Sequence, residues 1–493
     1  MASPALVSNH SDAGLSLMRS RALILILAFA ATLPLINPLV HGDGVGYYAY
    51  LRAPLIQHNL DFEQDWRRAN PGFAQARMGP GNQISLDNYT STGRIGNLFT
   101  VGPAILWSPF FLLAHAAVLI ANGLGANIPA DGFSFPYRVL TAFGTAVYGF
   151  LGLLLSYTLA RKYFNPAWAL LATVAIWAGS ALPVYMYFNP FWSHAHSAFI
   201  VSLFLWYWDR TRPDRTIGQW LLLGIISGLL VDVYFVNGVF LLLPLAEAIQ
   251  GYIQSAQAGD GALALRQFGS HAFYFLIFLL TVLPTLITRK IIFGGIFRFG
   301  AYSAMTWQWR APFLRSVLFS ADHGVVSWTP LLGLALIGLL IPYAPAKRIQ
   351  GYLLLAFLVF LYVISCYPYW DGLASYGNRF FISLTPVFIF GLTNLMERLA
   401  GYFRTFRAAY GAQAAAVAAL VVWNLAFIFQ WGIHLVPARG EISWSGMMRN
   451  QFVEVPQRIT QTVASYFTHR GELMQHIEQE DIEQQKLPPK RGD

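Results

Sequence analysis

The residues most able to do chemistry stand at the end of the first apolar stretch, where positions 41–50 read HGDGVGYYAY. Asp43 lies between two glycines, which give the backbone freedom and leave room for a bulky ligand. Tyr47 and Tyr48 add aromatic faces and hydroxyl donors. Because Gly-Asp-Gly is equally typical of a turn after a helix, the pattern indicates a ligand site without excluding a simple turn. No strand precedes the glycines, which excludes a dinucleotide-binding loop.

A pair of histidines forms the second candidate, in the short segment 188–196. His194 and His196, spaced i and i+2, could ligate a metal ion, donate hydrogen bonds to a phosphate or carry protons. Because no third ligand accompanies them, the pattern is weak evidence for a metal site. The alternative is that both are structural residues, hydrogen-bonded to backbone and water.

Arginines alternate with aromatic residues in the segment 290–324, which contains Arg298 and ends in Asp322-His323-Gly324. Guanidinium groups bind phosphate well and aromatic rings pack on chains or sugars, so a lipid-linked phosphate would suit this composition. An aromatic belt with snorkelling arginines at a membrane surface explains the composition equally well. Both interpretations stay open.

An arginine at the start of an apolar helix is the fourth candidate. Positions 367–380 read YPYWDGLASYGNRF, so Arg379 follows a flexible, glycine-containing turn and precedes an apolar run. A charge at this place is costly unless it pairs with an anion or a carboxylate. Arg379 is therefore the best candidate phosphate ligand, and a structural ion pair with Asp371 is the alternative. Asp232, near the end of another apolar stretch, suits a site or a structural role equally.

These segments require a membrane scaffold to position them. The 493 residues are 56% apolar and 11% charged, with a mean hydropathy of +0.48, whereas a soluble domain carries about 25% charged residues. In lipid the backbone must satisfy its own hydrogen bonds, so we expect an all-α, polytopic membrane helix bundle. About eleven spans are predicted from apolar runs long enough to cross. They lie at 22–40, 138–160, 167–187, 197–208, 218–233, 237–252, 271–289, 325–343, 351–367, 380–396 and 412–434.

Charge and cysteine content argue against a nucleic-acid-binding protein and against a protein held by disulfides or a cysteine-based metal cluster. The 32 Lys and Arg exceed the 23 Asp and Glu, for a formal charge of +9. Because the excess is spread over many connections without a basic block, we expect no nucleic-acid partner. The single cysteine, Cys366, excludes an internal disulfide and a cysteine-based metal cluster.

The distribution of arginines predicts the topology. Arg19 and Arg21 precede the first span and place the tail 1–19 in the cytoplasm. The main domain then covers 20–434, with outer segments at 41–137, 290–324 and 367–379, while short basic connections lie inside. Residues 98–122 are apolar enough to span, but a span there would invert every later connection, so we expect an interfacial or juxtamembrane helix. The outer tail, 435–493, would carry an amphipathic helix near 450–468 and then become disordered.

The four candidate segments, in this order, resemble the GT-C superfamily of integral-membrane glycosyltransferases. That superfamily includes protein O-mannosyltransferases, the lipid A aminoarabinose transferase and oligosaccharyltransferases. A first span leads there to a long outer loop that opens with an acidic residue and contains juxtamembrane helices, matched here by Asp43 and 98–122. Bacterial members share a Gly-Asp-Gly-x-Gly-Tyr-Tyr entry and segments similar to 318–330 and 375–380. The segment 188–196 departs from the pattern, because it lacks the acidic residue of better-known members.

The resemblance implies an inverting glycosyltransferase that takes a sugar from a polyprenyl-phosphate donor to a hydroxyl on an envelope glycan, lipid or protein. Asp43 would be the general base, and the site would face the outer side of a bacterial inner membrane. No metal is required, and a divalent ion stays possible. The residues that would hold the donor phosphate are Arg379, His194, His196 and His323, and those that would contact substrate are Tyr47, Tyr48, Tyr376, Asp371 and Arg298.

A transporter or flippase of a lipid-linked saccharide is the alternative function, since it would need a similar groove and similar arginines. Transporters often carry internal symmetry between their halves. The sequence shows no such repeat, and its long outer segments suit a surface active site better.

Overall fold

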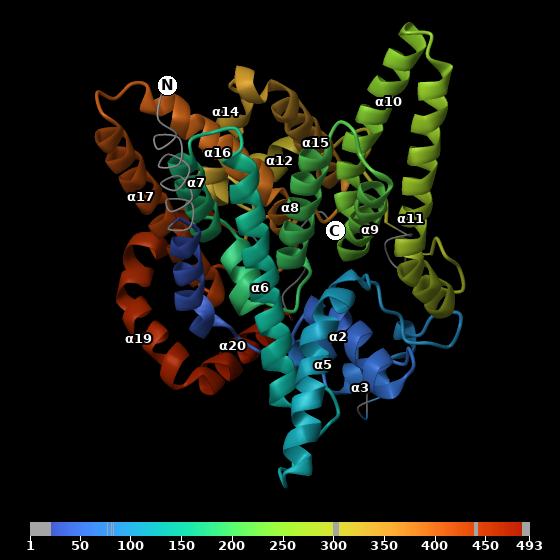
Figure 1. The fold of residues 1–493 in the computed structure, drawn as a ribbon. Coiled ribbons are helices and arrows are strands. Elements are labelled where there is room, and N and C mark those ends of the chain that lie inside the picture. Colours follow the sequence, from blue (N-terminus) through green and yellow to red (C-terminus); the bar gives the residue numbers. More distant parts are fainter. Residues whose placement is uncertain are drawn as a thin grey trace.

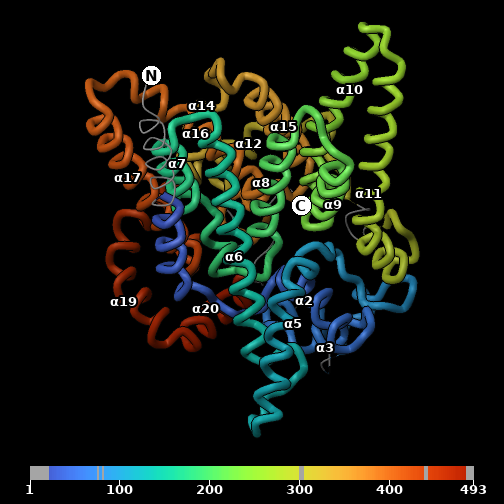
Figure 2. Tube along the Cα trace, viewed as in Figure 1, coloured from blue at the N-terminus to red at the C-terminus, as the bar shows by residue number. Residues whose placement is uncertain are grey.

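The computed structural model describes residues 21–75, 77–79, 81, 83–298, 305–437 and 442–485. The tail 1–19, residues 299–304 of the outer segment 290–324, and the end of the chain from 486 lie outside the described residues. Within them the regular elements are helices, arranged as a bundle that carries smaller helices at one end (Figures 1 and 2).

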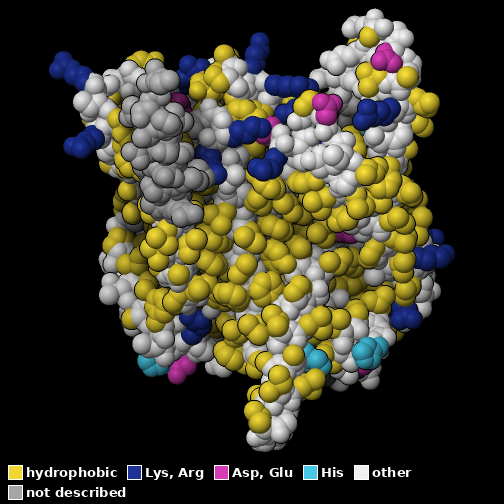
Figure 3. Space-filling model, in the orientation of Figure 1, with side chains coloured by type: hydrophobic (Ala, Val, Ile, Leu, Met, Phe, Trp, Pro, Cys, Tyr) yellow, Lys and Arg dark blue, Asp and Glu magenta, His cyan; other side chains and the backbone are white. Residues whose placement is uncertain are grey.

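A helix lies within each predicted span, although at 22–40, 167–187 and 325–343 the main helix is shorter than the predicted span. Among the described residues, seven helices are long and apolar enough to cross a membrane: Gly102–Gly123, Phe135–Ala160, Phe235–Gln257, Gly261–Phe293, Ala344–Cys366, Arg379–Ala400 and Phe406–Gly432. Shorter apolar helices lie at Arg21–Leu35, Pro166–Ala178, Ile217–Val233 and Pro330–Leu340. The predicted span 197–208 lies in α8 (His194–Thr211). The chain is a multi-pass membrane protein, and hydrophobic side chains cover the middle of its surface in Figure 3.

The bundle helices follow the chain in order. They are the first helix (Arg21–Leu35), α6 (Phe135–Ala160), α7 (Pro166–Ala178), α8, α9 (Ile217–Val233), α10 (Leu242–Gln257), α11 (Gly261–Phe293), α14 (Pro330–Leu340), α15 (Lys347–Cys366), α16 (Thr385–Ala400) and α17 (Phe406–Gly432). The shorter α12 (Leu314–Phe319) and α13 (Val325–Trp328) precede α14. Helix α16 lies at the centre, and it packs so closely on α14 that a Cβ at Gly338 or Gly391 would overlap the other backbone. In lipid no hydrophobic effect drives helices together, so close packing at small residues such as these stabilises the contact between the two helices.

The short basic connections meet at one end of the bundle, the upper end in Figure 1. Lys162 pairs with Asp209 at 2.6 Å, and Arg215 pairs with Glu247 at 3.1 Å. Arg348 donates a hydrogen bond to Gln250 at 3.3 Å. The connections that the arginine pattern placed on one side therefore do lie together, and helix α2 (Asp43–Arg52) lies toward the opposite end (Figure 1).

Helix α5 (Gly102–Gly123) does not run through the bundle between these two ends. Its first residue packs on the last residues of α9, so closely that a Cβ at Gly102 would overlap the backbone of Asp232 and Val233. From there α5 points away from the basic connections, and the chain returns to the start of α6 at the same end (Figure 1). Helix α5 is long and apolar enough to cross a membrane, and the interfacial or juxtamembrane placement expected for 98–122 stays a prediction.

The first outer segment folds around buried charges. It contains α2 (Asp43–Arg52), α3 (Glu63–Arg67) and α4 (Pro71–Gln75). The Arg52 guanidinium donates to both oxygens of the buried Asp65, at 2.7 and 2.6 Å. At the end of α11, the buried Arg289 donates to the carbonyl oxygens of Asn97, Leu98 and Phe99. Charge-assisted bonds of this kind fix the irregular segment against the bundle.

The C-terminal segment is more ordered than the sequence suggested. It forms α18 (Trp444–Arg449), α19 (Val455–Thr468) and α20 (Arg470–Gln485). The amphipathic helix expected near 450–468 is present as α19, but the helical structure continues to Gln485, where we expected disorder. Its Glu- and Gln-rich composition is typical of disordered chains, yet hydrogen bonds to distant parts of the chain hold α20 in place.

Candidate active site

Asp43 is the first residue of α2, and the two flanking glycines set its position. Gly42 has φ +55°, a conformation that favours glycine, and a Cβ there would lie 3.0 Å from the Trp192 ring. A Cβ at Gly44 would lie 2.7 Å from the Cβ of Phe191. The glycines therefore admit the segment 188–196 against the start of α2, and Gly42 also lines the cavity described below.

Arg379 forms an ion pair with Asp43, with 2.7 Å between Nη1 and Oδ2. Its guanidinium lies over the Trp192 ring, 4.5 Å from the ring centre. The Arg379 side chain is 13% exposed and that of Asp43 is 34% exposed. Two of the four candidate segments thus meet through their charged residues. The carboxylate in this ion pair is that of Asp43, whereas the sequence analysis considered Asp371 as a structural partner of Arg379.

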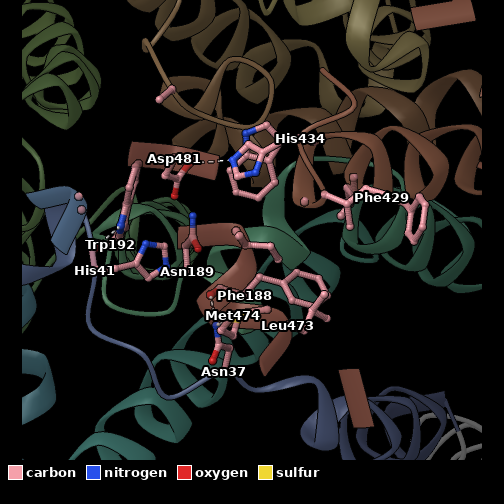
Figure 4. Close-up of a pocket in the computed structure, with 18 of the residues that line it drawn as sticks. Asn37, His41, Phe188, Asn189, Trp192, Phe429, His434, Leu473, Met474 and Asp481 are labelled. Carbon is pink, nitrogen blue, oxygen red and sulfur yellow. Dashed lines mark hydrogen bonds and ion pairs between the residues drawn. The ribbon is translucent and has the colours of Figure 1, made fainter. Parts of the chain in front are cut away.

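Both residues line a cavity of about 850 Å³. Figure 4 shows that His41, Asn189, Trp192 and Asp481 lie near one another in the close-up of this cavity. The polar lining residues include Asn37, His41, Asp43, Asn70, Arg77, Asn189, Trp192, Arg379, His434 and Asp481. A long apolar wall comes from the end of α17 and from α19, with Leu425, Ile428, Phe429, Ile459, Val463 and Phe467. The cavity can therefore hold a molecule with one polar end and one apolar chain.

Two tyrosines of the entry motif are buried outside this cavity. The Tyr47 hydroxyl accepts a hydrogen bond from Ser193 at 2.9 Å, and its ring packs on Phe99. The Tyr48 hydroxyl donates to the Gly132 carbonyl oxygen at 2.6 Å. Both side chains join α2 to neighbouring segments, and the structure does not bring them to the cavity wall.

The histidine pair separates into two aromatic environments. His194 packs among the rings of Tyr185, Trp192 and Tyr234, directly behind the residue on which Arg379 stacks. His196 lies between the rings of Trp107 and Tyr148. Neither histidine lines the cavity, but His194 is close to the ion pair through Trp192.

The remaining predicted residues of 318–380 build the loop that carries Arg379. His323 donates from Nδ1 to the Asp371 carbonyl oxygen at 2.8 Å, and an Asp371 carboxylate oxygen accepts the Leu373 backbone N–H. The buried Tyr376 hydroxyl bonds to Asn424 at 2.8 Å. None of these three side chains lines the cavity, although Gly372 and Leu373 beside them do.

Arg298 is far from this site in the fold. It is exposed just after the end of α11, where its Nη1 donates to the Phe293 carbonyl oxygen. Asp232, the other acid we singled out, is fully buried beside α5 and also lies off the cavity.

The cavity contains charged residues that the sequence gave no reason to select. Arg77 lies on its wall, where burial lowers the pKa of Arg77 and the nearby Asp43 opposes this shift. His434 Nε2 lies 2.7 Å from Asp481, and Nδ1 lies 3.1 Å from Glu480. Burial alone would lower the pKa of His434, but these carboxylates outweigh burial, so its pKa lies above the ordinary 6.5.

No cluster of three or more His, Cys, Asp or Glu side chains that could hold a metal ion occurs among the described residues. The arrangement they do form is a carboxylate beside a guanidinium, at the polar end of an amphipathic cavity. Such a site can accept a proton from a hydroxyl and bind an anion within one cavity.

No protein-family model matches the sequence, and no curated protein sequence matches it. Solved structures with a similar fold include ArnT from Cupriavidus metallidurans in the apo state, with a TM-score of 0.49 and 13% identity, over 95% of this chain and 74% of that chain. The same enzyme bound to undecaprenyl phosphate gives 0.46 and 12% over the same shares. The archaeal oligosaccharyltransferase AglB from Archaeoglobus fulgidus, in complex with an inhibitory peptide and a dolichol-phosphate, gives 0.45 and 12%, over 83% and 56%. The chain is similar in structure to ArnT and AglB.

Proposed function

We propose that this membrane protein is a glycosyltransferase that moves a sugar from a polyprenyl-phosphate donor to a hydroxyl acceptor. The observation that carries the proposal is the meeting of Asp43 and Arg379 at 2.7 Å on the wall of one amphipathic cavity. The motifs of the sequence, which resemble those of GT-C glycosyltransferases, support the same reaction class.

Arg379 is assigned the donor phosphate. A guanidinium presents parallel N–H donors that match two phosphate oxygens, and stacking over Trp192 holds its plane. The apolar wall of α17 and α19 would receive the polyprenyl chain, since it offers Ile428, Phe429 and Val463 along one side. The phosphate would then compete with Asp43 for Arg379 and release the carboxylate for chemistry.

Asp43 is assigned the general base. It takes the proton of the acceptor hydroxyl while that oxygen attacks the anomeric carbon. The new glycosidic bond forms as the bond from the anomeric carbon to the phosphate oxygen breaks, and the polyprenyl phosphate leaves with that electron pair, held by Arg379. Attack opposite the leaving group inverts the anomeric carbon.

The proposal places this chemistry on the outer face of a bacterial inner membrane. Helices α19 and α20, whose side chains line the cavity, lie toward the end of the bundle opposite the basic connections (Figure 1), and basic connections favour the cytoplasm. Nucleotide sugars stay in the cytoplasm, so an outer site needs a lipid-carried donor. The acceptor would be an envelope glycan, lipid or protein.

The test is release of polyprenyl phosphate by the purified protein from a panel of radiolabelled polyprenyl-phosphate sugars, with membrane extract as acceptor. We expect release by the wild type, loss in Asp43→Asn, and weakened donor use in Arg379→Ala. The reaction should persist in EDTA, because the assigned roles need no metal. Turnover that survives Asp43→Asn would refute the assigned base, and absence of turnover with every donor would refute the transferase and lead to a vesicle assay for flipping of lipid-linked sugars.

A further inference from the structure

The C-terminal helices, which the sequence analysis treated as a tail, form one side of the cavity. Side chains of α19 and α20 that line it include Ile459, Val463, Met474 and Asp481. Figure 1 shows α19 and α20 at the same end of the molecule as α2 and α3. The C-terminal helices also contact the segment that follows Asp43. Asn70 donates a hydrogen bond to Glu478, although the two residues are 408 positions apart in the chain.

The C-terminal helices hold the chain before Asp43. Tyr466 donates from its hydroxyl to the Leu35 carbonyl oxygen at 2.7 Å. Arg470 donates to the carbonyl oxygens of Ile36 at 2.7 Å and Pro34 at 2.9 Å. These bonds fix the end of the first helix, only a few residues ahead of the Gly42–Asp43 turn.

They also hold the chain after it, through one carboxylate. Glu478 of α20 accepts hydrogen bonds from the Asn70 side-chain amide at 2.8 and 3.1 Å and from the Gly72 backbone N–H at 2.6 Å. With its N–H₂ group bound in this way, Asn70 must turn its carbonyl oxygen in the other direction, where it accepts the Gly42 backbone N–H at 3.3 Å. The orientation of the amide is thus set by Glu478, and the amide in turn fixes Gly42.

We propose that Glu478 is a positioning residue for Asp43, acting through Asn70 and the backbone N–H of Gly42. Gly42 is the residue at which the chain turns into α2, with φ +55° and ψ −135°, and Asp43 follows it directly. Loss of the Glu478 contact lets the amide reverse, which removes the acceptor for the Gly42 N–H and allows the carboxylate to leave its place beside Arg379. The inference rests on the proposed role of Asp43 as the base.

The experiment removes the Glu478 acceptor and then restores it. Glu478→Ala removes both carboxylate oxygens, so the Asn70 side-chain amide and the Gly72 N–H lose their acceptor. Glu478→Gln keeps an oxygen at the place of Oε1, the atom that accepts both of these donors, and should preserve the chain of bonds. Glu472→Ala is the matched control, because Glu472 is an exposed acid on the same helix.

Two readouts decide the outcome. With the donor that supports turnover, kcat should fall about tenfold in Glu478→Ala, because small displacements of a catalytic group are costly, and should stay near the wild-type value in Glu478→Gln. Affinity for undecaprenyl phosphate should not fall in Glu478→Ala, because a displaced Asp43 carboxylate competes less for Arg379. Amide hydrogen exchange over residues 41–45 should rise in Glu478→Ala and match the wild type in Glu478→Gln, while Glu472→Ala changes neither kcat nor exchange.

The two proposals fail in different ways. If the wild type turns over no donor, the transferase assignment fails, and hydrogen exchange still decides whether Glu478 holds the Gly42–Asp43 turn. If turnover is present and Glu478→Ala leaves kcat and the exchange over residues 41–45 unchanged, the positioning role is overturned and the transferase stands. A loss in Glu478→Ala that Glu478→Gln shares in full would also overturn it, because Glu478→Gln keeps the acceptor oxygen.

Discussion

Asp43→Asn should bind polyprenyl phosphate more tightly than the wild type while losing turnover. In the structure the carboxylate already occupies Arg379, at 2.7 Å, so an incoming phosphate must displace it and also meet its negative charge. Asparagine keeps the shape of the side chain and removes that charge. The substitution therefore separates the two assigned roles, since it removes the base and improves the anion site.

The size of the effect follows from the geometry. Two unit charges 4 Å apart interact by about 4 kcal/mol at an effective dielectric constant of 20, which is an upper bound here. Because the Asp43 side chain is 34% exposed, water screens the pair and its net worth falls to about 1 kcal/mol. The affinity should then rise about fivefold. Arg379→Gln loses a charge-assisted contact of about 1.5–3 kcal/mol, so its affinity should fall about 10- to 150-fold.

Equilibrium binding of radiolabelled undecaprenyl phosphate to the purified protein in detergent measures both changes. Arg94→Gln is the matched control, because Arg94 is an exposed arginine of the first outer segment that does not line the cavity, and its affinity should equal that of the wild type. Weaker binding by Asp43→Asn would refute the reasoning. It would show that the carboxylate helps to hold the phosphate, for instance through a cation, rather than competing with it.

Three further predictions concern stability and docking. Arg52→Ala leaves Asp65 buried without its partner and should cost about 3–5 kcal/mol, seen as faster proteolysis of the first outer segment. Gly102→Ala places a Cβ against the backbone of α9 and should lower the thermal stability in detergent by about 1–3 kcal/mol, whereas Gly123→Ala, which meets nothing within 4 Å on the same helix, should not. Because the folded pKa of His434 lies above 6.5, its stabilisation of α20 is complete below pH 6.5 and is lost as the pH rises through the folded value. Hydrogen exchange in α20 should therefore increase with pH above 6.5, beyond the intrinsic pH dependence, and His434→Gln should remove that extra increase.

The spans were predictable because lipid leaves the chain few choices. A run of about 20 apolar residues in a bilayer must form a helix to satisfy its backbone, and the structure has a helix at each predicted place. The arginine pattern of the later connections predicts that 98–122 does not cross the membrane, and this topology stays a prediction, whereas the helix itself is present as α5. What the patterns could not supply was which helices touch, since packing between apolar helices depends on small residues such as Gly338 and Gly391.

The site was partly predictable for a related reason. Asp43 and Arg379 stand out in the sequence because a charge beside an apolar run is costly without a partner. Their pairing with each other was not predictable, since 336 residues separate them and only the packed bundle brings them together. The polar residues Tyr47, Tyr48 and Tyr376 looked equally suitable, but their hydroxyls are used in hydrogen bonds between segments of the protein.

The residues that the sequence failed to indicate share one property, which is that their partners are distant in the chain. Glu478 and Asp481 lie in a Glu- and Gln-rich stretch whose composition argues for disorder, and Arg77 is one of several arginines in a long loop. Their significance comes from contacts with Asn70, His434 and the cavity. A mostly polar helix can be stable when its charges meet fixed partners, and one of these partners, Asn70, also accepts the Gly42 backbone N–H. The order of the C-terminal helices and the geometry of the candidate base are therefore coupled, so that a change in one should appear in the other.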